Sequence, residues 1–131
     1  KNTLAVNSAV ASSNYLYKVD KNIDPRSHKI NIVKKNTKSH KTVTINQILK
    51  KNRLHKPFIV KIDIEGFEKD LFKKNIEWMN KFKIIIIEIH DWMLPKKNIS
   101  KNFIVALNKA MKKNNRDLII KGENLISIKY N

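Results

Sequence analysis

Two apolar runs in the middle of the chain stand out from their polar surroundings. Residues 58–64 (FIVKIDI) and 82–89 (FKIIIIEI) are short, nearly continuous and rich in isoleucine. Runs of this kind are typical of strands in a parallel sheet, where helices cover both faces. From Gly66 onward, apolar residues recur at helical spacing, namely at Phe67, Leu71 and Phe72. The pattern therefore predicts a strand, a helix and a second strand.

The period changes again after Pro95. A helix is expected with Ser100 as its N-cap and an apolar stripe along one face. That stripe comprises Phe103, Ala106, Leu107, Ala110 and Met111. Residues 116–122 and 124–130 then predict two strands joined by a turn at residues 122–124. The chain should end in an antiparallel hairpin.

The first third of the chain favours β-structure. Residues 3–10 and 15–19 predict two strands, and residues 28–35 alternate apolar with polar side chains, as a half-buried strand does. Residues 39–52 predict a short strand that leads into a helix, with Thr44 as the N-cap. Strands that alternate with helices indicate an α/β domain with a mainly parallel sheet.

The charge of the chain is strongly unbalanced. Lys and Arg contribute 28 of the 131 residues and Asp and Glu 11, so the net charge is +17. Lysine, asparagine and isoleucine are all abundant, which is the bias that AT-rich codons produce in proteins of any function. Arginine, which suits bidentate phosphate contacts, occurs only at Arg26, Arg53 and Arg116. We therefore expect only non-specific affinity for nucleic acid, although a small basic nucleic-acid-binding domain is the main alternative.

Other features of the composition narrow the class of protein. The chain has no cysteine, which excludes disulfides and thiolate metal sites and favours the cytoplasm. Its longest apolar run, residues 84–87, is far shorter than the ~20 residues that span a bilayer. We expect residues 1–131 to form one domain without a membrane span.

The acidic residues are concentrated in one region. Seven of the eleven lie between residues 63 and 91: Asp63, Glu65, Glu68, Asp70, Glu77, Glu88 and Asp91. Asp63 and Glu65 follow the first apolar strand, whereas Glu88 and His90 close the second. If these strands are parallel neighbours, both groups meet at one edge of the sheet. Such an edge can bind a cationic or hydroxylated ligand, hold a hard divalent ion or supply a general base.

Structural interpretations compete with these roles. Glu65 and Glu68 would also be favourable at the positive N-terminal end of the following helix. The remaining acids of the region, Asp70, Glu77 and Asp91, are interpreted as solvated surface charges. Both tryptophans, Trp78 and Trp92, are interpreted as packing residues.

The segment VKIDIEGFEKDLF, residues 60–72, resembles the signature of FkbM-type methyltransferases. In that family a Lys-Ile-Asp-x-Glu-Gly-x-Glu run ends the fourth strand. Other stretches resemble the family in the expected order along nearly the whole chain. These are NTLAVNSAVASSNYLYKV at the third strand and its hairpin, TVTINQIL before the fourth strand, FKIIIIEIHDW at the fifth and ENLISIKY at the last.

The resemblance implies a doubly wound, S-adenosylmethionine-dependent methyltransferase. It would methylate a hydroxyl of a small-molecule acceptor, often a saccharide. By position, Asp63 and Glu65 would be the catalytic residues beside the reacting methyl group, and Glu88 and His90 would bind the acceptor. The supporting residues of the turn would be Gly66 and Glu68. No metal ligand is assigned.

The sequence departs from the family in one respect. The family begins with a strand and a glycine-bearing cofactor loop, and a second strand ends in the acid that binds the ribose. Here the glycines are Gly66 and Gly122, and both belong to other turns. The resemblance thus implies a partial Rossmann-like methyltransferase sheet that lacks the N-terminal cofactor-loop strands and ends in an antiparallel hairpin.

Several expectations follow for the chain by itself. It should be inactive and bind S-adenosylmethionine no better than millimolar. The strand at residues 58–64 would have an unpaired edge, so the chain should be marginally stable or self-associate. A non-catalytic remnant that pairs with a partner chain is a further alternative.

Overall fold

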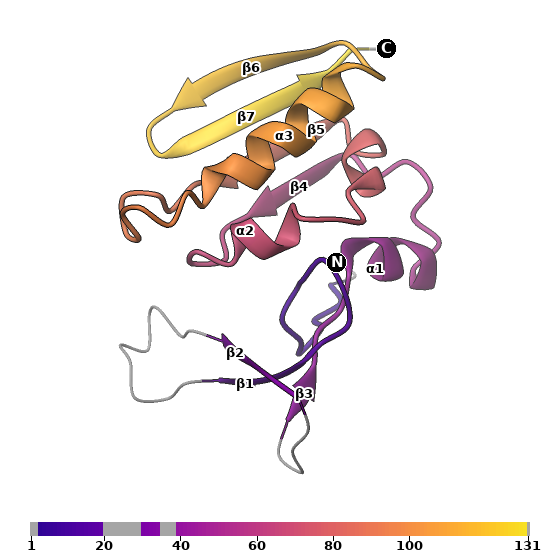
Figure 1. Cartoon of the computed structure of the whole chain (residues 1–131). Coiled ribbons are helices and arrows are strands. Elements are labelled where there is room, and N and C mark those ends of the chain that lie inside the picture. Colours follow the sequence, from indigo (N-terminus) through magenta and orange to yellow (C-terminus); the bar gives the residue numbers. More distant parts are fainter. Residues whose placement is uncertain (1–2, 20–29, 35–38, 131) are drawn as a thin grey trace.

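The computed structural model describes residues 3–19, 30–34 and 39–130. These residues form a mixed α/β structure with two sheets, and helices pack beside the larger one (Figure 1). The smaller sheet is antiparallel with the order β2-β1-β3, and the larger sheet has the order β4-β5-β7-β6. The strands are β1 (Leu16–Val19), β2 (Ile30–Val33), β3 (His40–Lys41), β4 (Ile59–Ile62), β5 (Ile84–Glu88), β6 (Arg116–Lys121) and β7 (Asn124–Lys129). The helices are α1 (Ile45–Lys51), α2 (Glu68–Leu71), α3 (Ser100–Met111) and the 3₁₀ helix η1 (Glu77–Asn80).

The larger sheet confirms two predictions and corrects a third. β4 and β5 are parallel neighbours, and β6 and β7 form the antiparallel hairpin with a left-handed Gly122 in its turn. The expectation of a mainly parallel sheet was wrong, because β7 is antiparallel to β5 as well as to β6. The hairpin explains this difference. Its two strands run in opposite directions, and the returning strand β7 lies against β5.

The core lies between the larger sheet and its helices. Ile85 and Ile87 of β5 are fully buried, and Phe103 of α3 packs against Phe72 with a ring separation of 4.9 Å. Four residues of the predicted stripe on α3 are buried, but Met111 is exposed because it lies at the last turn. The buried helical residues include Phe103, Ala106, Leu107, Ala110, Leu71, Trp78 and Met79. Burial of this apolar face stabilises the fold.

β4 was predicted to be buried on both faces, and the structure contradicts this prediction. It pairs with β5 alone among the described strands, so its other edge is open. Ile59 is half exposed, and Ile62 is its buried residue. β5 lies in the interior of the sheet, as its more continuous apolar run indicated. β4, the strand that Asp63 follows, is thus an edge strand of the larger sheet.

The N-terminal region follows the predictions in part. The strand predicted over residues 15–19 is confirmed as β1, and the described part of residues 28–35 contains β2. The strand predicted over residues 3–10 was wrong, since only Val10 forms a bridge there, with Val43. The helix expected after Gly66 is shorter than its pattern suggested: one turn of α2 is followed by η1.

The two longer helices begin in different ways. Thr44 caps α1 as predicted: its hydroxyl accepts the Gln47 N–H at 3.2 Å, and the Gln47 side chain accepts the Thr44 N–H at 3.0 Å. The N-cap assigned to Ser100 was wrong, because Ile99 occupies that position of α3. Instead the Asp91 carboxylate accepts the Ser100 N–H at 3.0 Å and also the Ser100 hydroxyl. Asp91 is therefore a capping residue and not the solvated charge that was predicted.

Replacing Asp91 by asparagine should lower the free energy of unfolding by about 1 kcal/mol at pH 7, because the charge-assisted hydrogen bonds from Ser100 become neutral ones. The hydrogen bond from the Ser100 side chain lowers the pKa of Asp91. A lowered pKa means that the stabilisation is present above the unfolded-state pKa of about 4 and disappears as the pH falls through the folded-state value.

Urea unfolding at pH 7 and at acid pH measures this difference. The wild type and the Asp91→Asn variant should converge at acid pH. The control is Glu123→Gln, which removes an exposed acid in the turn of the hairpin. Equal stability of the wild type and Asp91→Asn at pH 7 would show that the charge of Asp91 adds nothing to the cap of α3.

Candidate active site

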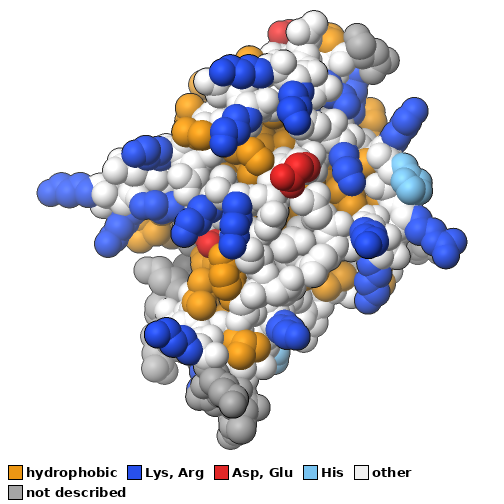
Figure 2. All heavy atoms as spheres, turned by 45° about the vertical axis from the view of Figure 1, so that its right-hand side comes forward, with side chains coloured by type: hydrophobic (Ala, Val, Ile, Leu, Met, Phe, Trp, Pro, Cys, Tyr) orange, Lys and Arg blue, Asp and Glu red, His pale blue; other side chains and the backbone are white. Residues whose placement is uncertain are grey.

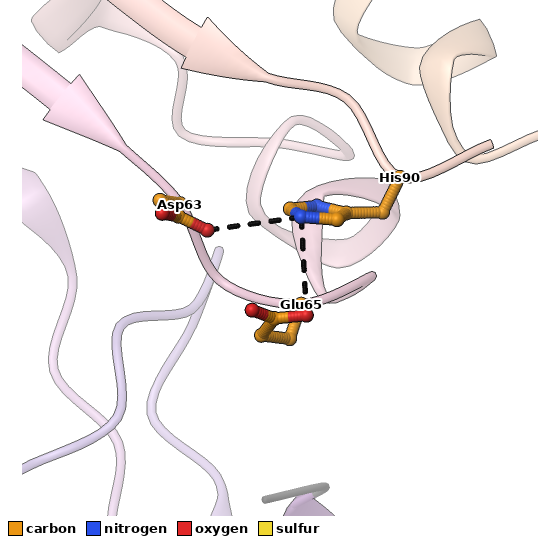
Figure 3. A group of neighbouring side chains, drawn as sticks. All are labelled: Asp63, Glu65 and His90. Atoms are coloured by element: carbon orange, nitrogen blue, oxygen red, sulfur yellow. Dashed lines mark ion pairs between the residues drawn. The ribbon is translucent and has the colours of Figure 1, made fainter. Parts of the chain in front are cut away.

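The two predicted acidic groups meet at one edge of the larger sheet. β4 and β5 are parallel, so the residues that follow them leave the sheet on the same side. Asp63 comes directly after β4, and Glu88 is the last residue of β5. Figure 3 shows Asp63, Glu65 and His90, which point toward one another from the two loops. Together with Glu88 these residues form the carboxylate rim.

His90 is at the centre of the carboxylate rim. Its side chain is only 2% exposed. The ring Nε2 lies 3.7 Å from Oδ1 of Asp63, 3.8 Å from Oε2 of Glu65 and 3.6 Å from Oε1 of Glu88. These distances exceed the hydrogen-bond range. One buried nitrogen therefore faces three carboxylates without a direct hydrogen bond to any of them.

Glu68 holds the imidazole from behind. Its carboxylate is fully buried, and Oε1 lies 2.8 Å from Nδ1 of His90. The same oxygen accepts the N–H of Ile64 at 3.3 Å, at the start of the turn. Because Nδ1 and Oε1 must share a proton at this distance, the ring is fixed with Nε2 toward the rim. The second oxygen, Oε2, has no hydrogen-bond partner among the described residues.

The turn after β4 sets the position of Glu65. Glu65 has a φ of +52° and Gly66 a φ of +91°, so two consecutive residues adopt left-handed backbone. A Cβ on Gly66 would lie only 2.6 Å from Cδ1 of Leu94. The left-handed backbone thus favours glycine, and a larger residue here would also displace the Leu94 side chain. The left-handed Glu65 is unfavourable for a residue with a side chain, which is common where function fixes a backbone.

Lys61 is a member of the site that the sequence did not reveal. Its Nζ lies 3.3 Å from Oε2 of Glu88 and 3.9 Å from Asp63, and it donates to the Asn124 side chain at 2.9 Å. Lysine is so common in this chain that its presence at position 61 did not indicate a functional residue. The alternation of side chains along a strand could have indicated it, since Lys61 and Asp63 are two residues apart and share a side of the strand. Lys61 offsets part of the negative charge of the rim.

A hollow of about 500 Å³ lies beside the turn. Ile64, Glu65, Gly66 and Phe67 line it from the turn, and Leu94 lines it from the loop after β5. Small-molecule sites in proteins commonly measure about 300–1,000 Å³. A small ligand in this hollow would contact the Glu65 side chain.

The remaining residues of the acidic region lie outside the carboxylate rim. Asp70 accepts the N–H of Ser12 at 3.0 Å, so it was wrongly interpreted as a solvated charge. Glu77 is exposed, as predicted. Trp78 is buried and confirms its packing role, but Trp92 is 66% exposed and does not. Trp92 stands two residues after His90, and its exposed ring is available to a ligand or a partner.

The chain matches one known protein family. The profile of the methyltransferase FkbM domain matches residues 2–117. This match covers most of the chain, including β4, β5 and every residue of the carboxylate rim. The chain belongs to the FkbM methyltransferase family. No curated protein and no solved structure gives a significant match.

Membership of the FkbM family gives the carboxylate rim its chemical context. The family is a family of methyltransferases, and its resemblance to this chain extends over the motif that forms the turn. Within the described residues, no helix of this FkbM protein is both long and apolar enough to cross a bilayer.

Proposed function

We propose that this FkbM-family chain forms the substrate side of an enzyme that transfers a methyl group from S-adenosylmethionine to a hydroxyl of a sugar or another small metabolite. The observation that carries the proposal is that Glu65 of the carboxylate rim also lines the hollow at the turn. Carboxylates can accept the proton of a hydroxyl and can orient its oxygen. The hollow is large enough for a small-molecule acceptor.

The residues of the turn fit a sulfonium cofactor in charge and in access. Asp63 and Glu65 are each more than a third exposed, and negative charge beside the hollow suits a ligand that carries a positive sulfur. Gly66 also lines the hollow, so its backbone borders the space that is open to a ligand. S-adenosylmethionine would supply the methyl group, whose carbon is electrophilic because it is bonded to a positively charged sulfur.

The chain's own residues act on the acceptor. Glu88 and His90 bind its hydroxyls, while Asp63 and Glu65 hold the reacting oxygen in line with the methyl group. The cofactor would supply the methyl group to that oxygen, and Asp63 or Glu65 would accept the proton of the hydroxyl. Glu68 and the Gly66 turn position these side chains.

Replacing Asp63 by asparagine should reduce methyl transfer at least tenfold in the protein that carries this chain. The variant keeps the shape of the side chain and loses the negative charge that accepts the proton. Asp63 is 45% exposed, so the fold should not change. Transfer of labelled methyl from S-adenosylmethionine to a panel of sugars and small alcohols measures the effect.

The matched control for this experiment is Glu77→Gln. It removes one exposed acid outside the carboxylate rim and should leave turnover unchanged. Unchanged turnover in Asp63→Asn would exclude Asp63 as a catalytic residue. A wild-type protein that methylates only amines or nucleic acids would contradict the proposed acceptor class.

The basic surface favours weak, non-specific binding of polyanions. In Figure 2 the Lys and Arg side chains are spread over the whole face in view, between apolar and uncharged patches. We expect any affinity for DNA or RNA to be lost between low and physiological salt, without sequence preference, because scattered lysines bind through counterion release. Fluorescence anisotropy with two unrelated duplexes at both salt concentrations tests this. Sequence-selective binding at physiological salt would make nucleic acid the leading ligand.

A further inference from the structure

We propose that the carboxylate rim binds a divalent transition-metal ion through Asp63, Glu65, Glu88 and Nε2 of His90. The proposal goes beyond methyl transfer, because binding of an ion to these residues needs neither cofactor nor acceptor. One ligand atom each from Asp63, Glu65 and His90 lie within 4.8 Å of one another. Glu88 brings a third carboxylate to the same nitrogen.

The separations between these atoms are close to those between ligands of one metal ion. Nε2 lies 3.6 to 3.8 Å from the three carboxylate oxygens. With metal–ligand bonds of about 2.1 Å, neighbouring ligands are about 3.0 Å apart in an octahedron and about 3.4 Å apart in a tetrahedron. Small rotations of the side chains would bring the four donors onto one ion.

His90 supplies an independent indication of a ligand. Its side chain is only 2% exposed, and Nδ1 contacts Glu68. The other ring nitrogen, Nε2, makes no hydrogen bond within the described residues and is directed into the rim. An ion bound at the rim would provide a partner for this nitrogen.

The contact between Glu68 and His90 has the form found behind metal-bound histidines. Such histidines usually donate their second ring N–H to a carboxylate, which fixes the ring and increases the basicity of the ligating nitrogen. Here Oε1 of Glu68 is 2.8 Å from Nδ1, and Glu68 is fully buried. The ligating nitrogen is therefore held in place before any ion arrives.

The charge of the rim also favours a cation. Asp63, Glu65 and Glu88 converge at one point, and Glu68 adds a fourth carboxylate behind the ring. Lys61 lies within 4.0 Å of only Asp63 and Glu88, and it is itself 45% exposed, so it screens the group weakly. A divalent ion would offset two of these charges at their centre. Asp63 and Glu65 are exposed enough for an ion to enter from solvent.

The donor set selects the class of ion. The chain has no cysteine, and a mixed imidazole and carboxylate site suits Mn²⁺, Fe²⁺, Co²⁺ or Zn²⁺ better than it suits Ca²⁺ or Mg²⁺, which prefer oxygen ligands alone. Water would complete the coordination. If the proposed function holds as well, the acceptor hydroxyl would replace one of these waters, and the ion would lower the pKa of that hydroxyl.

Titration of the 131-residue chain with Mn²⁺ tests the proposal, by calorimetry and by loss of the free-ion paramagnetic resonance signal. We expect one saturable site in the micromolar range and much weaker competition from Mg²⁺. His90→Gln should weaken binding at least tenfold. Asp63→Asn should also weaken binding at least tenfold. Because Asp63 is exposed, this variant keeps the test valid if replacing the buried His90 disturbs the fold.

Two further variants make the test specific. Lys61→Met should strengthen Mn²⁺ binding several-fold, because it removes the cation that competes for Asp63 and Glu88. Glu77→Gln removes an exposed acid outside the rim and should change nothing. Absence of saturable binding up to millimolar Mn²⁺, or equal affinity in all four variants, would show that the rim is only an ion-pair network.

This test separates the metal site from the proposed reaction. It is carried out without cofactor and acceptor, so a failure to bind Mn²⁺ overturns the metal site and leaves methyl transfer untouched. Conversely, a protein that binds Mn²⁺ at the rim but methylates no hydroxyl would retain the metal site and lose the proposed function.

Discussion

Replacing Arg116 by methionine should lower the free energy of unfolding by about 3 kcal/mol. Arg116 is only 5% exposed, and its recorded partners are neutral oxygens. It donates to the Ser127 hydroxyl at 2.8 Å and to the Met79 and Phe82 carbonyls at 3.3 Å each. One side chain thus joins β6 to β7, to η1 and to the start of β5.

The expected loss of stability comes from the carbonyl oxygens that would remain buried without a donor. Burial lowers the pKa of Arg116, but a guanidinium keeps its charge in proteins. Methionine fills similar space and avoids the cost of burying a charge. It nevertheless leaves buried backbone carbonyls without a donor, and these carbonyls cannot be removed by substitution. Arg116→Lys should recover only part of the stability, since an ammonium cannot reproduce the planar fork of donors.

Urea unfolding followed by circular dichroism measures the change. Lys121→Met is the matched control, because it removes one exposed positive charge from the other end of β6. It should alter stability by less than about 0.5 kcal/mol. Equal unfolding midpoints for Arg116→Met and Lys121→Met would show that the hydrogen bonds of Arg116 contribute nothing.

The 131-residue chain should self-associate through β4. This strand has an open edge in the described structure, and Phe58 and Ile59 beside it are 66% and 51% exposed. Open apolar edges pair with strands of other molecules. The net charge of +17 opposes association, so raising the salt concentration should screen the repulsion and increase the association.

Sedimentation velocity at low and high salt tests this expectation. Ile59→Lys should convert the associated species to monomer, because a charge on an edge strand blocks pairing. Val105→Lys adds the same charge on an exposed face of α3 and should leave association unchanged. A wild-type chain that is monomeric at both salt concentrations would contradict the role of the β4 edge.

The sequence predicted the centre of the site because that centre depends on few conditions. Asp63, Glu65, Glu88 and His90 come together once the two strands are parallel neighbours, and strand order follows from the apolar runs. The Glu68 contact depends on where one turn of α2 directs a side chain, which periodicity does not specify. The role of Asp91 depends on the path of the loop before α3. Both contacts are tertiary, and no local pattern encodes them.

The errors in the fold have similar causes. Residues 3–10 contain strand-forming residues, but a strand needs a partner along its length, and only Val10 has one in the described structure. The terminal hairpin was recognised from its turn, whereas its insertion with β7 against β5 depends on which strand edge is available. The apolar run of β4 indicated burial on both faces, yet its place at the edge of the sheet leaves Ile59 exposed.

The close approach of Leu94 to Gly66 has a consequence for altering selectivity. Leu94 occupies the space that a side chain at Gly66 would need, so the loop after β5 rests directly on the turn that carries Glu65. Both residues also border the same hollow. In the proposed reaction, exchanging this loop in order to admit a different acceptor would displace Glu65 as well. An engineered loop must therefore be redesigned together with the turn beneath it.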